Sequence, residues 1–336
     1  GLLAGALALS AAQARAQTAA DLDGIFSRFS ATTPGCAVGL DRPNQPVLTR
    51  AWGMADLEHG VPNTPDTVFE SGSVAKQFTA AAILLLARDG RLSLKDDVRK
   101  YIPELWAYPT PVTIEQLLNH TSGLRDWGDV AQLAGWPRTT RAYTNEEALT
   151  IAFRQRSLNY VPGAEYSYTN TGYILAAEVV RRVSGQTLSQ FSNERIFKPL
   201  GMSRTQWRDD FRRIVPGRAV AYRAGPAQDM PFESTYGHGG LLTTVSDLLT
   251  WNRALAEDRL APGLYAEMQV QGVLTGGRRI SYARGLQIEQ RLGRKEVAHS
   301  GSTAGYRTWL AYYPAEKVSV AVVVNYRPGA DGEMQP

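Results

Sequence analysis

The hydrophobic pattern of this 336-residue chain changes from strand-like to helical and back again, and that change constrains the fold more than any other feature. Near the start, residues 35–40 and 47–54 predict two strands separated by turn-forming residues. Toward the end, residues 308–313 and 318–325 alternate with a period of two, which predicts an antiparallel meander. We therefore expect an α/β fold of the α+β type, in which both chain ends complete one antiparallel sheet flanked by helices.

The middle of the chain predicts a helical region inserted into that sheet. The segments with helical periodicity and capping signals are 74–88, 113–119, 145–156, 171–183, 188–197 and 246–256. Two further strand-like segments, 281–291 and 295–298, lead into the final meander. We assign residues 17–72 and 275–336 to the sheet-containing part of a single unit, and residues 73–274 to its mainly helical part.

Composition excludes several classes of protein. Hydrophobic residues make up 43% of the chain and charged residues 20%, as in ordinary globular proteins. The formal charge of +4 is scattered rather than gathered into a basic run, so nucleic-acid binding has little support. The single cysteine, Cys36, excludes an intrachain disulfide and a cysteine-based metal site.

The first residues resemble a leader. Residues 2–12 are apolar and rich in alanine, and the string Ala-Arg-Ala at 14–16 suits signal-peptidase cleavage before Gln17. We therefore predict a signal peptide at residues 1–16, truncated at its own N-terminus, and a secreted or periplasmic protein. A packed N-terminal helix is the alternative, although it would normally show a polar face. No later segment approaches eighteen apolar residues, so no membrane span is expected.

Ser73 and Lys76 lie three residues apart where a strongly helical, apolar segment begins. Residues i and i+3 share a helix face, so the amine would reach the hydroxyl. A serine becomes a good nucleophile only when a base takes its proton, and a lysine acts as that base only when burial lowers its pKa. The pair suggests acyl-enzyme chemistry, although S-x-x-K alone is a weak motif. The alternative is that Ser73 caps the helix and Lys76 is a surface charge.

The Tyr-x-Asn motif, which would provide a second proton carrier, occurs twice. The copy at 143–145 runs into two glutamates, and we interpret it as a helix cap with an acidic first turn. Tyr168 and Asn170 follow a Pro-Gly turn and precede an apolar helix, so their loop can project into a cleft. Tyr168 is therefore the candidate, with ordinary aromatic packing as the alternative.

His-x-Gly also occurs twice. His238 precedes a helix, whereas His299 and Gly301 lie between two predicted strands. At a sheet edge there, the backbone would be able to donate an N–H to a substrate oxygen. Small residues such as Ser302 allow close backbone approach. His299 is therefore the better candidate, although a lone histidine is usually structural.

The three motifs, in this order and spacing, resemble those of the penicillin-recognising serine hydrolases. The chain is most similar to the class C β-lactamase-like family, which also holds D-alanyl-D-alanine carboxypeptidases, D-aminopeptidases and esterases. Accessory strings that agree lie at 90–97, 101–104, 117–124, 239–241 and 246–248. The resemblance covers about residues 21–325. It implies a serine hydrolase that acts on amide or ester bonds through an acyl-enzyme, without a metal or organic cofactor.

The resemblance also implies residue roles. Ser73 would be the nucleophile, and the backbone N–H groups of Ser73 and Ser302 would form the oxyanion hole. Lys76 would hold or receive the serine proton. Tyr168 would act with it as general base and general acid, provided that cationic neighbours lower the tyrosine pKa.

The remaining motif residues would bind or orient. Asn170 would hydrogen-bond Lys76 or the substrate amide, and His299 would orient the substrate or stabilise Tyr168. His120 and His238 lie in family-like strings but outside the three motifs, so we interpret them as structural or cleft-lining.

One position departs from the family pattern. β-lactamases of this family normally carry a lysine where this chain has His299, and that lysine provides a fixed positive charge for the substrate carboxylate. A histidine is mostly neutral at pH 7. We therefore expect a bias toward D-amino-acid peptides or carboxylic esters, with Arg284 and Arg307 as candidates to restore the charge or as ordinary surface arginines. A β-lactamase and a non-catalytic penicillin- or peptide-binding module are the alternatives. The sequence fixes neither the substrate nor the oligomeric state.

Overall fold

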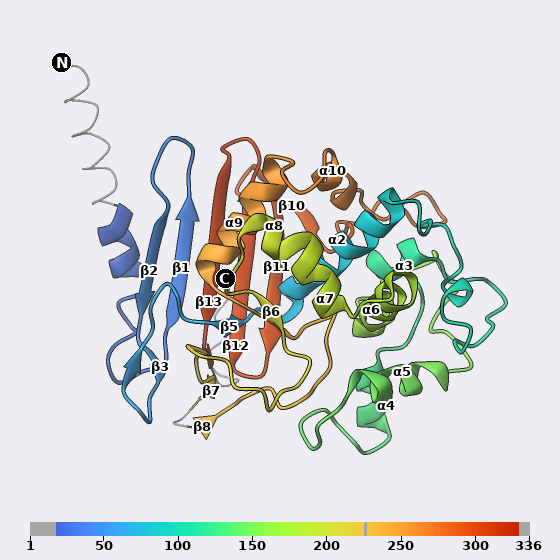
Figure 1. Cartoon of the computed structure of the whole chain (residues 1–336), viewed down its shortest axis with the longest axis horizontal. Coiled ribbons are helices and arrows are strands. Elements are labelled where there is room, and N and C mark those ends of the chain that lie inside the picture. Colours follow the sequence, from blue (N-terminus) through green and yellow to red (C-terminus); the bar gives the residue numbers. More distant parts are fainter. Residues whose placement is uncertain (1–17, 225–226, 329–336) are drawn as a thin grey trace.

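One six-stranded antiparallel sheet, built from both ends of the chain, forms one side of the molecule (Figure 1). The computed structural model describes residues 18–224 and 227–328, so the predicted leader at 1–16 lies outside the described residues. The strand order is β10-β11-β12-β13-β1-β2, which confirms the predicted fold class. The strands are β1 (Cys36–Asp41), β2 (Leu48–Trp52), β10 (Gln287–Arg291), β11 (Arg294–Thr303), β12 (Tyr306–Tyr313) and β13 (Val318–Val324).

The pairing of β1 with β13 joins the two ends of the chain. Cys36 lies opposite Val324, and the register continues along both strands. The buried side chain of Asn325 accepts a 2.7 Å hydrogen bond from the backbone N–H of Gly35 and donates to the carbonyl of Val220, also at 2.7 Å. One amide therefore fastens the end of β13 to two segments that are distant in sequence.

Helices cover the sheet and form a lobe beside it (Figure 1). Besides a helix at residues 18–25, they are η1 (Gly72–Val74), α2 (Ala75–Arg88), η2 (Val98–Lys100), α3 (Ile114–Leu118), α4 (Trp127–Leu133), α5 (Asn145–Phe153), α6 (Asn170–Ser184), α7 (Leu188–Ser192), η3 (Asn193–Phe197), α8 (Lys198–Leu200), α9 (Val245–Ala256) and α10 (Leu264–Met268). Among the described residues, no helix has both the length and the apolar character that crossing a bilayer requires.

Short strands complete the architecture. They are β3 (Met54–Asp56), β4 (Val61–Pro62), β5 (Phe69–Glu70), β6 (Gln206–Trp207), β7 (Tyr222–Arg223), β8 (Ala227–Gln228), β9 (Leu241–Thr243) and β14 (Tyr326–Arg327). Strand β9 pairs with both β5 and β6, so β5 enters η1 from within a small sheet.

Helix α9 packs across β1 and β13, although it belongs to the segment 73–274 that we predicted as mainly helical. A glycine on β1 permits this close approach, because a Cβ added to Gly39 would lie 2.7 Å from Leu249 Cδ1. A helix that covers the sheet, α9, thus comes from within the inserted segment 73–274. The division of the chain into a sheet-containing part and a mainly helical part stays a prediction.

Strand β11 is longer than the sequence predicted. The expected strand at 295–298 continues to Thr303, so His299 lies inside a strand rather than between two strands. Strand β10 pairs with Arg294–Ala298, whereas β12 pairs with the second half of β11. The pairing with β10 ends at Ala298. Beyond that residue, this edge of β11 approaches η1 instead.

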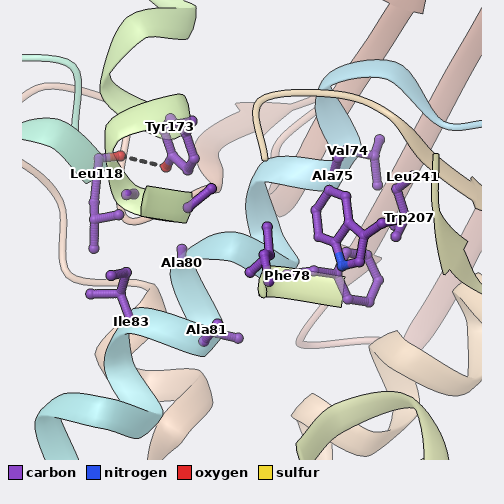
Figure 2. Close-up of a cluster of buried hydrophobic side chains, with 14 of the residues drawn as sticks. Val74, Ala75, Phe78, Ala80, Ala81, Ile83, Leu118, Tyr173, Trp207 and Leu241 are labelled. Atoms are coloured by element: carbon purple, nitrogen blue, oxygen red, sulfur yellow. Dashed lines mark hydrogen bonds between the residues drawn. The ribbon is translucent and has the colours of Figure 1, made fainter. Parts of the chain in front are cut away.

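Helix α2 is enclosed by other elements. Every residue from Ala75 to Leu86 is buried, and Figure 2 shows side chains such as Trp207 and Tyr173 packed around the helix. The ring of Phe78 lies 4.3 Å from that of Trp251. A helix that is apolar on all sides is a core helix, so α2 gives the residues at its start a rigid mounting.

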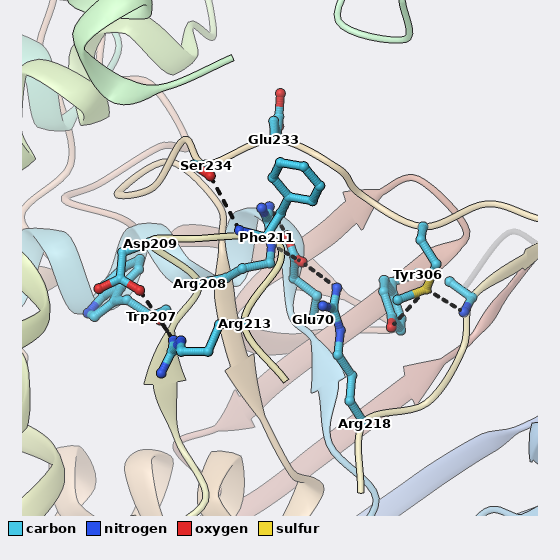
Figure 3. Close-up of polar contacts among 12 residues, drawn as sticks. Glu70, Trp207, Arg208, Asp209, Phe211, Arg213, Arg218, Glu233, Ser234 and Tyr306 are labelled. Atoms are coloured by element: carbon cyan, nitrogen blue, oxygen red, sulfur yellow. Dashed lines mark hydrogen bonds and ion pairs between the residues drawn. The ribbon is translucent and has the colours of Figure 1, made fainter. Parts of the chain in front are cut away.

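A buried ion pair holds β5, the strand that leads into η1 (Figure 3). The carboxylate of Glu70, at the end of β5, accepts hydrogen bonds of 2.7 and 3.0 Å from Arg208. Arg218 approaches the same carboxylate at 3.4 Å. Since Glu70 and Arg208 are 1% exposed, neither charge has water as a substitute partner.

Substituting Glu70→Gln should therefore destabilise the protein strongly, because Arg208 would keep a buried charge without its carboxylate. We expect the free energy of unfolding to fall by about 3–5 kcal/mol, measured by urea denaturation. The control Glu257→Gln breaks an exposed 3.7 Å pair with Arg259 and should cost less than about 1 kcal/mol. Equal losses in the two variants would contradict the role given to the buried pair.

Candidate active site

Ser73 lies in the single turn η1, immediately before α2. The alternative that it caps the helix fails, because the N-cap of α2 is Val74 and that cap makes no side-chain hydrogen bond. The Ser73 hydroxyl instead lies 3.0 Å from the Nζ of Lys76. The helical spacing therefore brings these two groups together as predicted.

Lys76 is fully buried, and its Nζ has three polar neighbours. They are Ser73 Oγ at 3.0 Å, Asn170 Oδ1 at 2.9 Å and the His238 carbonyl at 2.8 Å. Burial lowers the pKa of Lys76 well below its usual value, and this outweighs the nearby Asp126 carboxylate, which raises it. The surface-lysine alternative therefore fails as well.

A neutral amine has two N–H donors and one lone pair. The amide oxygen of Asn170 and the carbonyl of His238 only accept, so they take both N–H groups. In the neutral form, which the lowered pKa favours, the lone pair would be left for the hydroxyl of Ser73, 3.0 Å away. Such an amine would be placed to take the proton of Ser73.

Tyr168 stands on the other side of the nucleophile. Its phenol has a hydrogen bond with Ser73, and its ring centroid lies 4.7 Å from Lys76 Nζ and 4.2 Å from the ring centroid of His120. The residue is 39% exposed, so part of the ring stays open to solvent.

The expectation that cationic neighbours lower the pKa of Tyr168 is wrong. Burial of the phenol raises that pKa, and the hydrogen bond to Ser73 offsets only part of the effect. The physical reason is desolvation of the phenol, to which the nearby Tyr166 and Asp126 add, and no cationic neighbour offsets it. A raised pKa keeps the proton on Tyr168 at neutral pH.

Asn170 is held in place by Asp126. The backbone N–H of Asn170, the first residue of α6, donates a 2.6 Å hydrogen bond to Asp126 Oδ2. The other carboxylate oxygen accepts from the N–H of Gly128 at 2.8 Å and caps α4. One carboxylate thus fixes two helix starts at the site. The sequence analysis missed Asp126, although an aspartate directly before a helical segment is a capping signal.

His299 is buried within β11. Its Nδ1 is 2.6 Å from the carbonyl of Ser300, and its Nε2 is 2.8 Å from the hydroxyl of Tyr282. Its ring centroid lies 6.3 Å from that of Tyr168, so the two rings are neighbours without stacking. Tyr282 lies outside every sequence motif, so nothing in the sequence singled it out.

The backbones of η1 and β11 approach each other closely. A Cβ on Gly301 would lie 1.9 Å from the carbonyl oxygen of Ser71 and 3.3 Å from the nitrogen of Ser73. A Cβ on Gly72, whose φ is +53°, would lie 2.5 Å from the nitrogen of Ser302. Glycine is required at both positions. The nitrogens of Ser73 and Ser302 thus lie close to this contact, as a two-donor oxyanion hole needs.

The two motif copies that we did not choose as catalytic candidates play different parts in the structure. Thr144 and Glu147 form a capping box at the start of α5, which confirms that the first Tyr-x-Asn copy is a helix cap. His238, the rejected His-x-Gly histidine, enters the site through its backbone carbonyl. His120 supports the ring of Tyr168, and its Nδ1 accepts from the N–H of Thr169 at 3.2 Å.

Both arginines suggested by the sequence have hydrogen-bond partners of their own, and Arg307 also lines a cavity with Ser300, Gly301 and Ser302. Arg284 donates to Glu115 at 2.5 Å, and Arg307 donates to backbone carbonyls of its own turn. The cation that acts on Lys76 is Arg138, which donates a 3.0 Å hydrogen bond to Glu233. Within residues 18–224 and 227–328, no group of three or more His, Cys, Asp or Glu side chains is placed to hold a metal ion.

Replacing Lys76 with Arg removes the lone pair and adds a permanent charge. We expect p-nitrophenyl acetate hydrolysis and fluorophosphonate labelling to fall by at least about 10³-fold, with exposed Lys95→Arg as the control.

The pH dependence of the wild type tests the same lysine. Activity should rise with pH through the lowered pKa of Lys76 and should persist at pH values below the usual lysine pKa. Onset of activity only near pH 10 would contradict a neutral Lys76.

Gly301→Ala should push β11 away from η1, because the new methyl group overlaps the Ser71 carbonyl. We expect kcat to fall by about 10²–10³-fold, as for loss of an oxyanion donor. The control Gly276→Ala places a methyl group where no atom lies within 4 Å. Equal kcat in the two variants would show that this contact does not position the oxyanion hole.

Two curated D-aminopeptidases are similar to this chain in sequence. The chain is 31% identical over 304 residues to a D-aminopeptidase of Gluconobacter oxydans, covering 88% of this chain and 57% of that protein. It is 29% identical over 304 residues to a D-aminopeptidase of Cereibacter sphaeroides, covering 88% and 58%. The chain thus spans somewhat more than half the length of these curated relatives.

Solved structures show the same fold. An octameric penicillin-binding protein homologue from Pyrococcus abyssi superimposes with a TM-score of 0.77 at 27% identity, covering 94% of this chain and 73% of that one. The model of the family described as Beta-lactamase matches residues 22–335. The predicted superfamily is therefore confirmed, and the chain belongs to the Beta-lactamase family.

Proposed function

We propose that this protein is a serine hydrolase that cleaves D-amino-acid amides or short D-peptides through an acyl-enzyme on Ser73. One observation carries the proposal: the fully buried Nζ of Lys76 lies between two oxygens that only accept and the Ser73 hydroxyl at 3.0 Å, with no carboxylate among these contacts. This arrangement solves the central difficulty of serine catalysis, which is removal of the hydroxyl proton at neutral pH.

Acylation follows from the positions of the groups. The oxygen of Ser73 attacks the substrate carbonyl carbon as its proton moves to Lys76, and the carbonyl oxygen becomes an oxyanion held by the N–H groups of Ser73 and Ser302. Tyr168 then gives its proton to the leaving nitrogen as the C–N bond breaks, and Lys76 returns a proton to Tyr168. The products of this half are the acyl-enzyme and a free amine.

Deacylation reverses the proton path. Water attacks the acyl carbon and gives up a proton to the Tyr168–Lys76 pair, and the bond to Ser73 breaks as the serine oxygen regains its proton. The sum of both halves is hydrolysis of one amide by one water. An ester would react by the same steps with an alcohol as the leaving group.

The choice of D-amino-acid substrates rests on relatives and on charge. Curated relatives at about 30% identity are named D-aminopeptidases. A D-amino acid amidase from Ochrobactrum anthropi SV3, 23% identical, shares the fold with a TM-score of 0.76, covering 93% of this chain and 90% of that one. Burial lowers the pKa of His299 to about 3, so this position carries no charge for the carboxylate of a β-lactam. Secretion rests on residues 1–16 alone.

A non-catalytic binding module is the weaker candidate. Enclosing a lysine amine among protein atoms costs free energy, and a module that only binds has no chemical need for that cost. The nucleophile, base and phenol would all be dispensable in such a protein, whereas here they are joined by direct contacts.

A substrate panel tests the proposal. We expect the protein to hydrolyse D-alaninamide with kcat/KM at least on the order of tenfold above L-alaninamide, and to turn over nitrocefin more slowly than D-alaninamide. Ser73→Ala should abolish turnover and fluorophosphonate labelling. Dominant nitrocefin turnover would favour a β-lactamase. A wild type that neither labels nor hydrolyses any amide or ester would favour the binding module.

A further inference from the structure

Tyr282 lies between α10 and β10, outside every motif, yet its hydroxyl touches the histidine of the third one. The side chain is 1% exposed, and its hydroxyl is 2.8 Å from His299 Nε2. Its own carbonyl accepts a 3.0 Å hydrogen bond from the N–H of Gly272, which fixes the backbone that carries the ring. The contact is therefore built from rigid parts.

The partners of His299 determine its tautomer. A carbonyl oxygen only accepts, so the 2.6 Å contact with Ser300 requires a proton on Nδ1. A neutral imidazole has one N–H, so Nε2 carries the lone pair and accepts from the hydroxyl of Tyr282. Both ring nitrogens are then satisfied, and no N–H of His299 is left to offer to a substrate.

The surroundings of His299 oppose a positive charge. The ionisable groups that face it are Lys76 on α2, His120 after α3, Tyr168 before α6 and Tyr282 before β10. None of these is an acid that would pair with an imidazolium, and Lys76 becomes positive during acylation. A second cation here would oppose the proton transfer from Ser73.

We propose that Tyr282 is a specificity-determining residue, because its hydroxyl holds His299 in the neutral Nδ1–H form and so denies a carboxylate-bearing substrate a cation at this position. The inference rests on the proposed function and deepens it. The preferred substrates are then amides and peptides that have no carboxylate at the end that lies near His299. In the related β-lactamases a lysine stands at the position of His299.

A phenylalanine in place of Tyr282 isolates the hydroxyl from the ring. The ring packs edge-on against His120 at 4.5 Å and against Tyr168 at 5.9 Å, and both contacts survive the substitution. Tyr173→Phe is a matched control. Tyr173 is also fully buried and also packs on His120, at 5.2 Å, but its hydroxyl donates to the Leu118 carbonyl. Tyr173 also interacts with the Tyr282 hydroxyl, and Tyr173→Phe leaves the contact of that hydroxyl with His299 in place.

The test compares two substrates that differ only in the critical charge. They are D-Ala-D-Ala with a free carboxylate and D-Ala-D-Ala amide, and the measured quantity is the ratio of their kcat/KM values between pH 5 and pH 8. Protonation of Lys76 lowers kcat/KM for both substrates alike, so its effect cancels in the ratio. The peptide carboxylate stays ionised throughout this range. The wild type and Tyr173→Phe should give a low ratio that does not change with pH.

In Tyr282→Phe, His299 loses the donor that favours its neutral form, so its pKa should rise from the low value that burial and Lys76 give it, and Nε2 should bind a proton more readily as the pH falls. The carboxylate-to-amide ratio should then rise by about tenfold or more toward pH 5, the gain expected from a charge-assisted hydrogen bond. His299→Lys, with Tyr282 intact, should raise the ratio at every pH. A ratio in Tyr282→Phe that stays as flat as in Tyr173→Phe would overturn the inference.

Two further results keep the inference separate from the proposed function. If the wild type cleaves neither peptide, the proposed function fails, and the tautomer is still measurable by ¹⁵N NMR of the imidazoles. That spectrum should show His299 with a bare Nε2 down to pH 5. If Tyr282→Phe does not fold, the wild-type spectrum decides alone, and a protonated Nε2 would overturn the inference.

Discussion

The burial of one amine governs the rest of this structure. Lys76 has two protein acceptors and one hydroxyl around its Nζ, in a helix where every residue from Ala75 to Leu86 is buried. A carboxylate in contact with Nζ would keep the amine charged, and a charged amine has no lone pair with which to accept the proton of Ser73. In the proposed mechanism, proton transfer from Ser73 therefore depends on having neutral oxygens, rather than a carboxylate, in contact with Lys76.

The fold supplies that environment by converging distant segments. The acceptors of Lys76 come from the start of α6 and from the segment before β9, which lie 94 and 162 residues away along the chain. The oxyanion strand comes from the C-terminal part of the chain and presses on η1 through Gly72 and Gly301. The ion pair of Glu70 with Arg208 anchors the strand before the nucleophile. The nucleophile turn is thus held on several sides before substrate binds.

Sequence reasoning succeeded where the determining interactions are local or repeat with a simple period. Alternation predicted the sheet, helical spacing predicted the contact of Ser73 with Lys76, and the capping box at Thr144 explained the first Tyr-x-Asn copy. It failed where a role is fixed by distant contacts. The carbonyl of His238 leaves no mark in the sequence, because any residue provides one. The pKa of Tyr168 was misjudged because it depends on how far the fold buries the phenol.

The resting site therefore holds little charge, and the reaction creates it. As Ser73 attacks, an oxyanion forms beside the backbone N–H groups while Lys76 becomes an ammonium ion a few ångströms away. In a dry site these opposite charges attract more strongly than in water. Asp126, fixed by backbone N–H groups at two helix starts, adds a negative charge that favours the new ammonium ion. A protonated His299 would work against this arrangement, because it would be a standing positive charge beside Lys76. The neutral histidine therefore adds no positive charge beside Lys76 while it acts as a filter on substrates.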